Sequence, residues 1–235
     1  MTVSSDSTYE LSRDNIIAAA MRKIGALSRG QSPDSEDLSN AQIALNSLIA
    51  LFQTLGMPLW ARAEYSITLV ASQRDYTIGS GQTINTDFPL RIYKANLSNS
   101  DGSAVPEVNP MARADFMLLN TSTIGTPVNY TYQPKVNLGV LSLWPKPDAT
   151  AVSTYTLKLT YQRPFYGFTS ASETPDFPQE WQLALTYGLA DLLAPEYGVP
   201  LLDRQVLSKQ AKDFLDKALD GGAEETSMFF QAERR

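Results

Sequence analysis

The chain has 235 residues, with 19 Lys and Arg against 25 Asp and Glu, so its formal net charge is −6 at pH 7. This length allows one large or two small domains, and a chain of this size can bury a core without disulfides or a structural metal. The sequence contains no Cys and no His. Their absence excludes Ser-His and Cys-His nucleophilic catalysis, thiolate chemistry and zinc sites built from these ligands. What survives is carboxylate-only chemistry, either a glycosidase-like pair or a Mg²⁺ site.

The first residues lack a basic stretch followed by an apolar run, so they do not resemble a signal peptide. Residues 38–61 carry no charge, but Ser, Asn, Gln and Thr interrupt them too often for a bilayer-crossing helix. We therefore expect a soluble, intracellular protein without a membrane partner.

Two helices are predicted near the start of the chain. Ser12 is a potential N-cap of the first, which should end near residues 28–30. The second should begin at Ser32-Pro33, with Pro in its first turn, and stop at Gly56 and Pro58. Its apolar residues recur at spacings of three and four, which is typical of an amphipathic helix: Leu38, Ala41, Leu45, Leu48, Phe52 and Leu55.

From about residue 63 the apolar period changes to two, which predicts strands. Further extended runs are expected at 128–133, 138–143 and 153–162, and a short helix that starts at Asn109-Pro110 and carries Phe116 and Leu119. Helical spacing returns from Trp181 to Leu193 and again from about Pro200 to Asp220.

The predicted class is α+β, with an antiparallel helical bundle formed by both chain ends and an inserted antiparallel β-rich section. The expected boundaries are 1–62 and 175–220 for the bundle, 63–174 for the insert and 221–235 for an extended C-terminal tail.

The second helix has an unusual polar side. A surface helix of a monomer usually carries Lys and Glu there, but this one offers only neutral groups, which cost less to desolvate. One interpretation is that a second face packs against another subunit, and the other is that the helix is central in its own bundle. The candidate interface residues are Asn40, Ser47, Gln53 and Thr54.

The C-terminal tail contains an apolar cluster beyond a double-glycine stop. Exposed apolar clusters usually mark interaction surfaces, so the cluster predicts docking on another chain, whereas the alternative is folding back onto its own bundle. The candidate partner-binding residues are Met228, Phe229, Phe230, Arg234 and Arg235.

Other patterns favour structural roles. Eight aromatic residues could form a sugar-binding or base-stacking platform, but their alternation in strands favours cross-strand packing: Tyr130, Tyr132, Trp144, Tyr155, Tyr161, Phe165, Tyr166 and Phe168. Arg and Lys are not clustered, which weakens any grip on nucleic acid. No carboxyl pair stands out as an acid and base, so we expect no catalytic residue, cofactor or metal.

The order of five segments resembles the head-to-tail adaptor proteins of tailed bacteriophages, also described as head-completion, connector or tail tubular proteins. The resemblance covers about residues 12–220 and rests on DNIIAAAMRKIGAL (14–27), ALNSLIALFQTLGMPLW (44–60), QRDYTIGSGQ (73–82), LSLWPKP (141–147) and LALTYGLADLLAPEYGVP (183–200). The phrase LAPEYG within the last segment is the most distinctive.

This resemblance implies a non-enzymatic structural protein of the virion, assembled in the host bacterial cytoplasm. It implies a ring, most often of twelve subunits, beneath the portal protein, with a central channel for double-stranded DNA and a β section facing the next tail component. It also implies portal binding by the C-terminal extension. The alternatives are a carboxylate-dependent cell-wall glycosidase and a carbohydrate-binding tail module.

Overall fold

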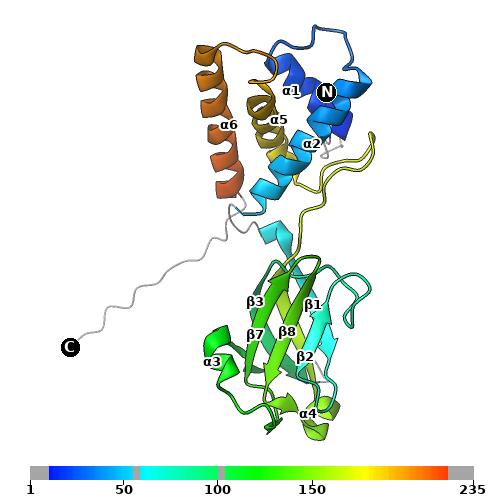
Figure 1. Ribbon diagram of the computed structural model, residues 1–235, viewed down its shortest axis with the longest axis vertical. Coiled ribbons are helices and arrows are strands. Elements are labelled where there is room, and N and C mark those ends of the chain that lie inside the picture. The colour runs from blue at the N-terminus through cyan, green and yellow to red at the C-terminus, as the bar shows by residue number, and fades with distance from the viewer. Residues whose placement is uncertain (1–10, 55–58, 100–103, 222–235) are drawn as a thin grey trace, which may run out of the picture. The chain divides into compact units, whose positions relative to one another are not determined.

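The computed structural model describes residues 11–54, 59–99 and 104–221, and the chain divides into two compact units (Figure 1). The helical unit contains the described residues up to Trp60 and from Phe165 onward, and the β unit spans Ala61–Pro164. All the described strands lie in the β unit and the four longest helices lie in the helical unit, which confirms the α+β class.

The helical unit is organised around one apolar helix. It contains α1 (Arg13–Lys23), α2 (Ser35–Phe52), η2 (Gln179–Trp181), α5 (Gln182–Leu193) and α6 (Leu201–Gly221). Because α5 is apolar around most of its circumference, it has to be covered on several sides, and α1, α2 and α6 all contact it. Gly188 allows the closest approach of α2, since a Cβ there would lie 3.0 Å from Leu48 Cδ2.

The helix ends differ from the predicted ones in three places. The Asp34 carboxylate accepts hydrogen bonds from the Glu36 and Asp37 N–H groups, so α2 starts at Ser35 rather than at Ser32-Pro33. Ser12 precedes α1 but makes no side-chain cap. The α1 helix also ends at Lys23, before residues 28–30, because Gly25 takes a left-handed φ of +75° and closes the last turn.

The segment after the β unit caps α1 in place of Ser12. The backbone N–H groups of Arg13 and Asp14 donate to the carbonyl oxygens of Glu173 (2.9 Å) and Ala171 (3.4 Å). Phe165 stacks on Trp60 with ring centroids 4.8 Å apart. Residues 165–174 therefore belong to the helical unit, whereas the sequence-based boundary had placed them in the β-rich insert.

The β unit contains two four-stranded sheets. One has the order β1 (Arg62–Thr68), β10 (Tyr155–Gln162), β3 (Arg91–Asn99), β4 (Ala104–Glu107), and the other β2 (Asp75–Ile78), β8 (Leu138–Trp144), β7 (Asn129–Lys135), β5 (Asn109–Pro110). Side chains from both sheets share one buried cluster that includes Ile67, Leu97, Leu141 and Leu157. Because successive side chains of a strand point to opposite faces of its sheet, every second residue enters this cluster, which explains the period of two in the sequence.

Two short pairings in the β unit are parallel rather than antiparallel. The strand β5 pairs with β7, and β6 (Ile124–Gly125) pairs with β9 (Lys146–Pro147). The predicted helix start at Asn109-Pro110 is also wrong, because these residues are extended. The N–H groups on either side of Pro110, those of Asn109 and Met111, donate to the carbonyl oxygens of Val128 and Tyr130. The helix α3 (Arg113–Met117) begins later, and α4 (Ala149–Thr154) precedes β10.

Candidate interaction surfaces

The exposed side of α2 is free of charge after its first turn. We call it the α2 outer face, and it comprises Ser39, Asn40, Ile43, Ser47, Ala50, Leu51 and Thr54. Ile43 is 65 % exposed and Leu51 is 52 % exposed, although both are large apolar side chains. Of the predicted interface residues, Asn40, Ser47 and Thr54 lie on this face and Gln53 is half-buried at the end of the helix.

Two hydroxyl groups of the α2 outer face, those of Ser47 and Thr54, donate to backbone carbonyl groups of α2. Ser47 Oγ donates to the Ile43 carbonyl at 2.9 Å, and Thr54 Oγ1 donates to the Leu51 carbonyl at 2.7 Å. Covering such groups costs little, because their hydrogen bonds survive the loss of water. The face is therefore suited to burial against another surface.

Two other neutral residues of α2 act inside the helical unit. The carbonyl oxygen of Phe168 accepts hydrogen bonds from Gln42 Nε2 and Asn46 Nδ2, both at 3.1 Å, and the Phe168 N–H donates to Asn46 Oδ1 at 2.8 Å. Arg13 donates to Gln42 Oε1 at 2.6 Å. We call Gln42 and Asn46 the α2 inner edge, and they fasten the 165–174 segment to α1 and α2.

A second exposed apolar surface lies at the start of α6. Leu201, Leu202 and Val206 are 66, 75 and 59 % exposed, and we call them the α6 patch. These residues were not predicted as a surface, because they lie outside the apolar stripe of α6 that contains the buried Leu207 and Ala218. The feature of the sequence that could have predicted the α6 patch is the presence of large apolar residues outside that stripe.

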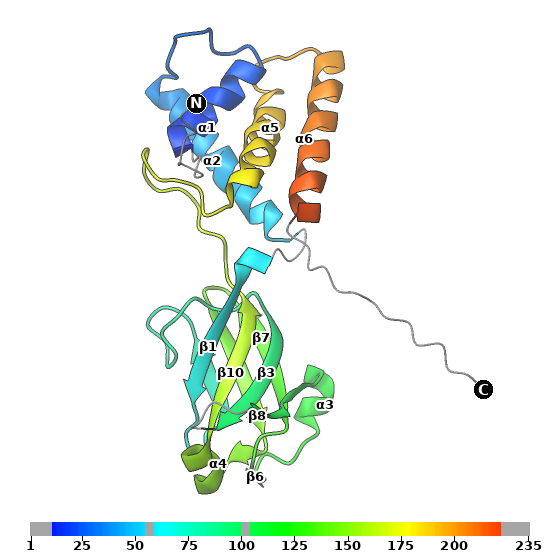
Figure 2. The same cartoon turned by 180° about the vertical axis from the view of Figure 1, so that it is seen from behind.

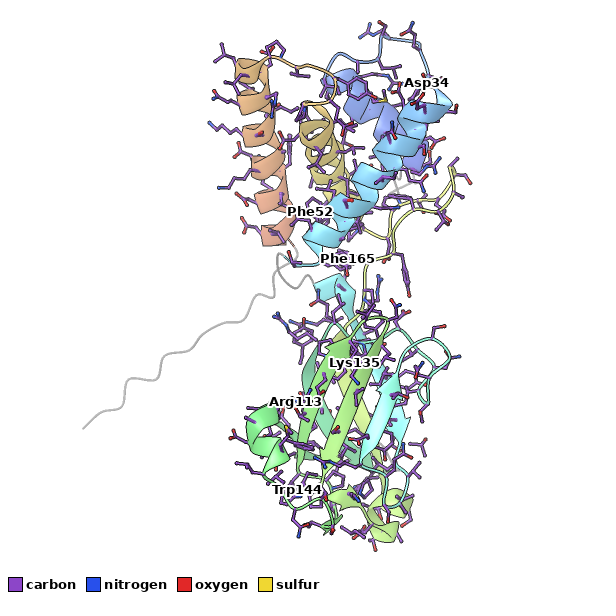
Figure 3. All side chains as sticks on the ribbon, in the orientation of Figure 1. Asp34, Phe52, Arg113, Lys135, Trp144 and Phe165 are labelled. Carbon is purple, nitrogen blue, oxygen red and sulfur yellow. The ribbon has the colours of Figure 1, made fainter. Side chains whose placement is uncertain are left out.

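A groove runs between α2, α5 and α6. It has a volume of about 200 Å³ and is lined mainly by apolar side chains, among them Leu51, Phe52, Leu192 and Leu215. Ser208 donates a hydrogen bond to the Asp191 carboxylate at the rim. Phe52 marks the end of α2 in Figure 3 and lies beneath the groove, with only 3 % of its surface exposed.

The aromatic residues do not form an exposed row. Tyr130, Tyr161, Phe165 and Phe168 are buried, and the half-buried Tyr132 donates its hydroxyl to the Pro89 carbonyl. Of the eight candidates, Tyr166 is exposed. This arrangement matches cross-strand and core packing, and it provides no stacking platform for a sugar from these eight side chains.

The carboxylate of Glu173 is held as an anion. It accepts hydrogen bonds from the Thr169 hydroxyl (2.7 Å) and from the N–H groups of Ser170 (2.9 Å) and Thr169 (2.6 Å). These bonds lower the pKa of Glu173 from 4.5 to about 2. A glycosidase acid needs a raised pKa, so Glu173 has the environment of a loop anchor.

The Tyr197 phenol is held by the start of α2. Burial and the hydrogen bond that its hydroxyl donates to Asp37, at 2.5 Å, raise the pKa of Tyr197 to about 12.

Within the described ranges, no group of three or more Asp and Glu side chains is placed to hold a metal ion. No helix among the same residues is long and apolar enough to cross a membrane.

The candidate tail residues Met228, Phe229, Phe230, Arg234 and Arg235 lie outside the part of the chain that the structure describes. The surfaces described above belong to residues 11–54, 59–99 and 104–221. Among those residues, the α2 outer face and the α6 patch are exposed apolar surfaces formed by helices of the helical unit.

Comparison with known proteins identifies the family. Residues 11–231 match the family described as SU10 adaptor protein, and the chain belongs to that family. This agrees with the resemblance to phage head-to-tail adaptors found in the five sequence segments. No curated protein matches the chain. The family gives the protein the role of a bacteriophage adaptor and a component of the virion.

Proposed function

We propose that this protein is a structural, non-enzymatic adaptor that forms a ring, of about twelve copies as in similar phage adaptors, beneath the portal protein at the head-tail junction. The ring surrounds the channel for double-stranded DNA, helps to retain the packaged genome and docks the downstream tail or nozzle protein. Assembly takes place in the host bacterial cytoplasm. The observation that carries the proposal is membership of the adaptor family, supported by an uncharged, exposed α2 outer face.

The charge of the chain supports a conduit rather than a DNA-binding protein. A net charge of −6 gives the protein no general attraction to phosphates. DNA that must leave the capsid has to slide past the channel wall, so tight phosphate binding would oppose ejection. No cofactor or metal is required for this role.

A ring also explains why neutral side chains occupy the α2 outer face. In a closed ring, one face of each subunit meets a different face of its neighbour, and every subunit has both faces covered. Asn40, Ser47, Gln53 and Thr54 are the polar residues that we assign to such a contact. Met228, Phe229, Phe230, Arg234 and Arg235 are assigned to the portal.

Electron microscopy of the protein mixed with the portal protein of the same phage tests the proposal. We expect an added ring layer on the portal. A variant that ends at Gly221 tests the tail: it should keep the helix content and thermal unfolding of the full chain but bind the portal much more weakly. A portal that gains no layer contradicts the proposed ring, and full binding by the shortened chain contradicts the assignment of the tail.

A further inference from the structure

Within the residues that the structure describes, two exposed apolar surfaces of the helical unit lie on different helices. One is the α2 outer face, with Ile43 and Leu51, and the other is the α6 patch, with Leu202 and Val206. Figures 1 and 2 show α5 between α6 and α1, and α5 contacts α6 as well as α1 and α2. The two surfaces therefore lie on different helices of the same unit.

A hollow next to the α6 patch complements the protruding side chain on α2. The hollow has a volume of about 510 Å³ and lies between the end of α1 and the start of α6. Its apolar lining includes Ile24, Pro200, Val206 and Leu207. Ile43 projects from the middle of the α2 outer face with 65 % of its surface exposed, so it offers an aliphatic side chain to such a hollow.

The charges around the two surfaces are opposite in sign. Asp34, Glu36 and Asp37 form the start of α2, and Asp34 is labelled there in Figure 3. The hollow carries Arg22 and Lys23 at its rim, with Asp203 as the acidic residue of its lining. Glu36 lies two helical turns before Ile43, about 10 Å along the axis, so both contacts can form together.

We infer that the α2 outer face of one copy packs against the α6 patch and hollow of the next copy, with Ile43 in the hollow and Glu36 beside Arg22. This inference rests on the proposed function and names the two faces of the ring contact. Pairing α2 with α2 would bring acidic first turns together, and pairing hollow with hollow would bring basic rims together. The charges therefore favour the mixed, head-to-tail contact that a ring needs.

Cysteine cross-linking tests the contact directly, because the natural chain contains no Cys. The variant with Ile43→Cys and Val206→Cys, bound to the portal protein and treated with a short bismaleimide, should give a ladder of covalent species that extends beyond the dimer. Each single variant should give no ladder. Ile43→Cys combined with Leu183→Cys, an exposed residue of α5, is the matched control and should also give none.

Dimers from Ile43→Cys alone would show that α2 meets α2 and would overturn the inference. So would the absence of a ladder from the double variant while electron microscopy shows a ring layer on the portal. In that case the proposed function survives and the assigned faces are wrong. If no layer forms on the portal with the natural chain, the proposed function itself fails.

A charge exchange provides a second test with a different readout. Glu36→Arg should lower the yield of the cross-linked ladder severalfold, and so should Arg22→Glu. The variant with both changes should restore the yield, because the pair is again opposite in sign. Both side chains are exposed in the free chain, so each change removes only a favourable interaction with a helix end and the variants should still fold. Equal loss in the double variant would contradict contact between these two residues.

Discussion

The two polar sides of α2 carry similar neutral residues, but one side forms hydrogen bonds within the helical unit and the other is exposed. On the inner edge, Asn46 forms hydrogen bonds to the N–H and the carbonyl group of Phe168. Gln42 donates to the same carbonyl and accepts a hydrogen bond from Arg13. On the outer face, Ser47 bonds only to its own helix, and Ile43 is exposed beside it. A neutral polar side chain on a helix can thus be an internal fastener or part of a surface that is ready to be covered.

This difference bears on the two interpretations of the uncharged helix. Part of the pattern arises because α2 is packed within its own unit, where a charge at position 42 or 46 would lose its water without gaining the same hydrogen bonds. On the α2 outer face, by contrast, Asn40, Ile43 and Ser47 are exposed. The predictions below test this division by pairing neighbouring positions on the two sides of one helix.

The largest contrast is expected between Phe52 and Leu51. Phe52 contacts the rings of Phe177 and Trp181, with centroids 6.4 and 5.8 Å away, and Leu51 is half exposed. Phe52→Ala should lower the free energy of unfolding by about 3–5 kcal/mol, because it leaves a cavity among aromatic rings. Leu51→Ala should change it by only about 0.5 kcal/mol. Chemical denaturation of the two variants measures both values, and similar losses would contradict the division.

A smaller contrast is expected between Asn46 and Ser47. Asn46→Ala removes two hydrogen bonds to Phe168 and should cost about 2 kcal/mol of stability. Ser47→Ala removes a bond within the helix and should stay within about 0.5 kcal/mol of the natural chain. Thermal unfolding of both variants compares their midpoints, and Asn46→Ala should have the lower one. Equal midpoints would show that the inner edge does not fasten the 165–174 segment.

The smallest effect is expected at Glu173, which orders the same segment. Its pKa is lowered from 4.5 to about 2, so the anion favours the folded state above pH 4.5, and this contribution is lost as the pH falls from 4.5 towards 2. Glu173→Gln should be less stable than the natural chain at pH 6, and the gap should narrow on acidification through that window. A gap that stays constant from pH 6 to pH 2.5 would contradict the assigned hydrogen bonds.

Much of the fold could be predicted from periodicity. The helical stripes of α2, α5 and α6 and the alternation in β7, β8 and β10 mark real elements, because each has one side in a core. The helix α6 lies within one residue of the predicted span, 200–220. Local patterns are informative where burial is continuous along an element.

The failures occur where a distant segment supplies the partner. Ser12 makes no cap because the Glu173 and Ala171 carbonyls occupy that position from far along the chain. Asn109-Pro110 is extended because the edge of β7 takes its hydrogen bonds. The division into units falls at Phe165 and not at the predicted residue 174, and Phe165 packs on Trp60 of the helical unit.

Candidate surfaces were predictable only in part. The absence of charge between residues 38 and 61 pointed to the α2 outer face, but the same absence covers Gln42 and Asn46, which face inward. The α6 patch was hidden because Leu201, Leu202 and Val206 look like ordinary helix residues until burial separates them from Leu207. Exposure, which depends on neighbours in space, carries this information.

The central proposal is that the protein is a structural part of the head-tail junction. The most direct measurement is to produce phage particles without it and to examine their DNA content and tails by electron microscopy. The account predicts filled heads that lose their genomes and gain no tails, with both properties restored when the protein is supplied. Particles that keep their DNA and carry normal tails in its absence would contradict the claim.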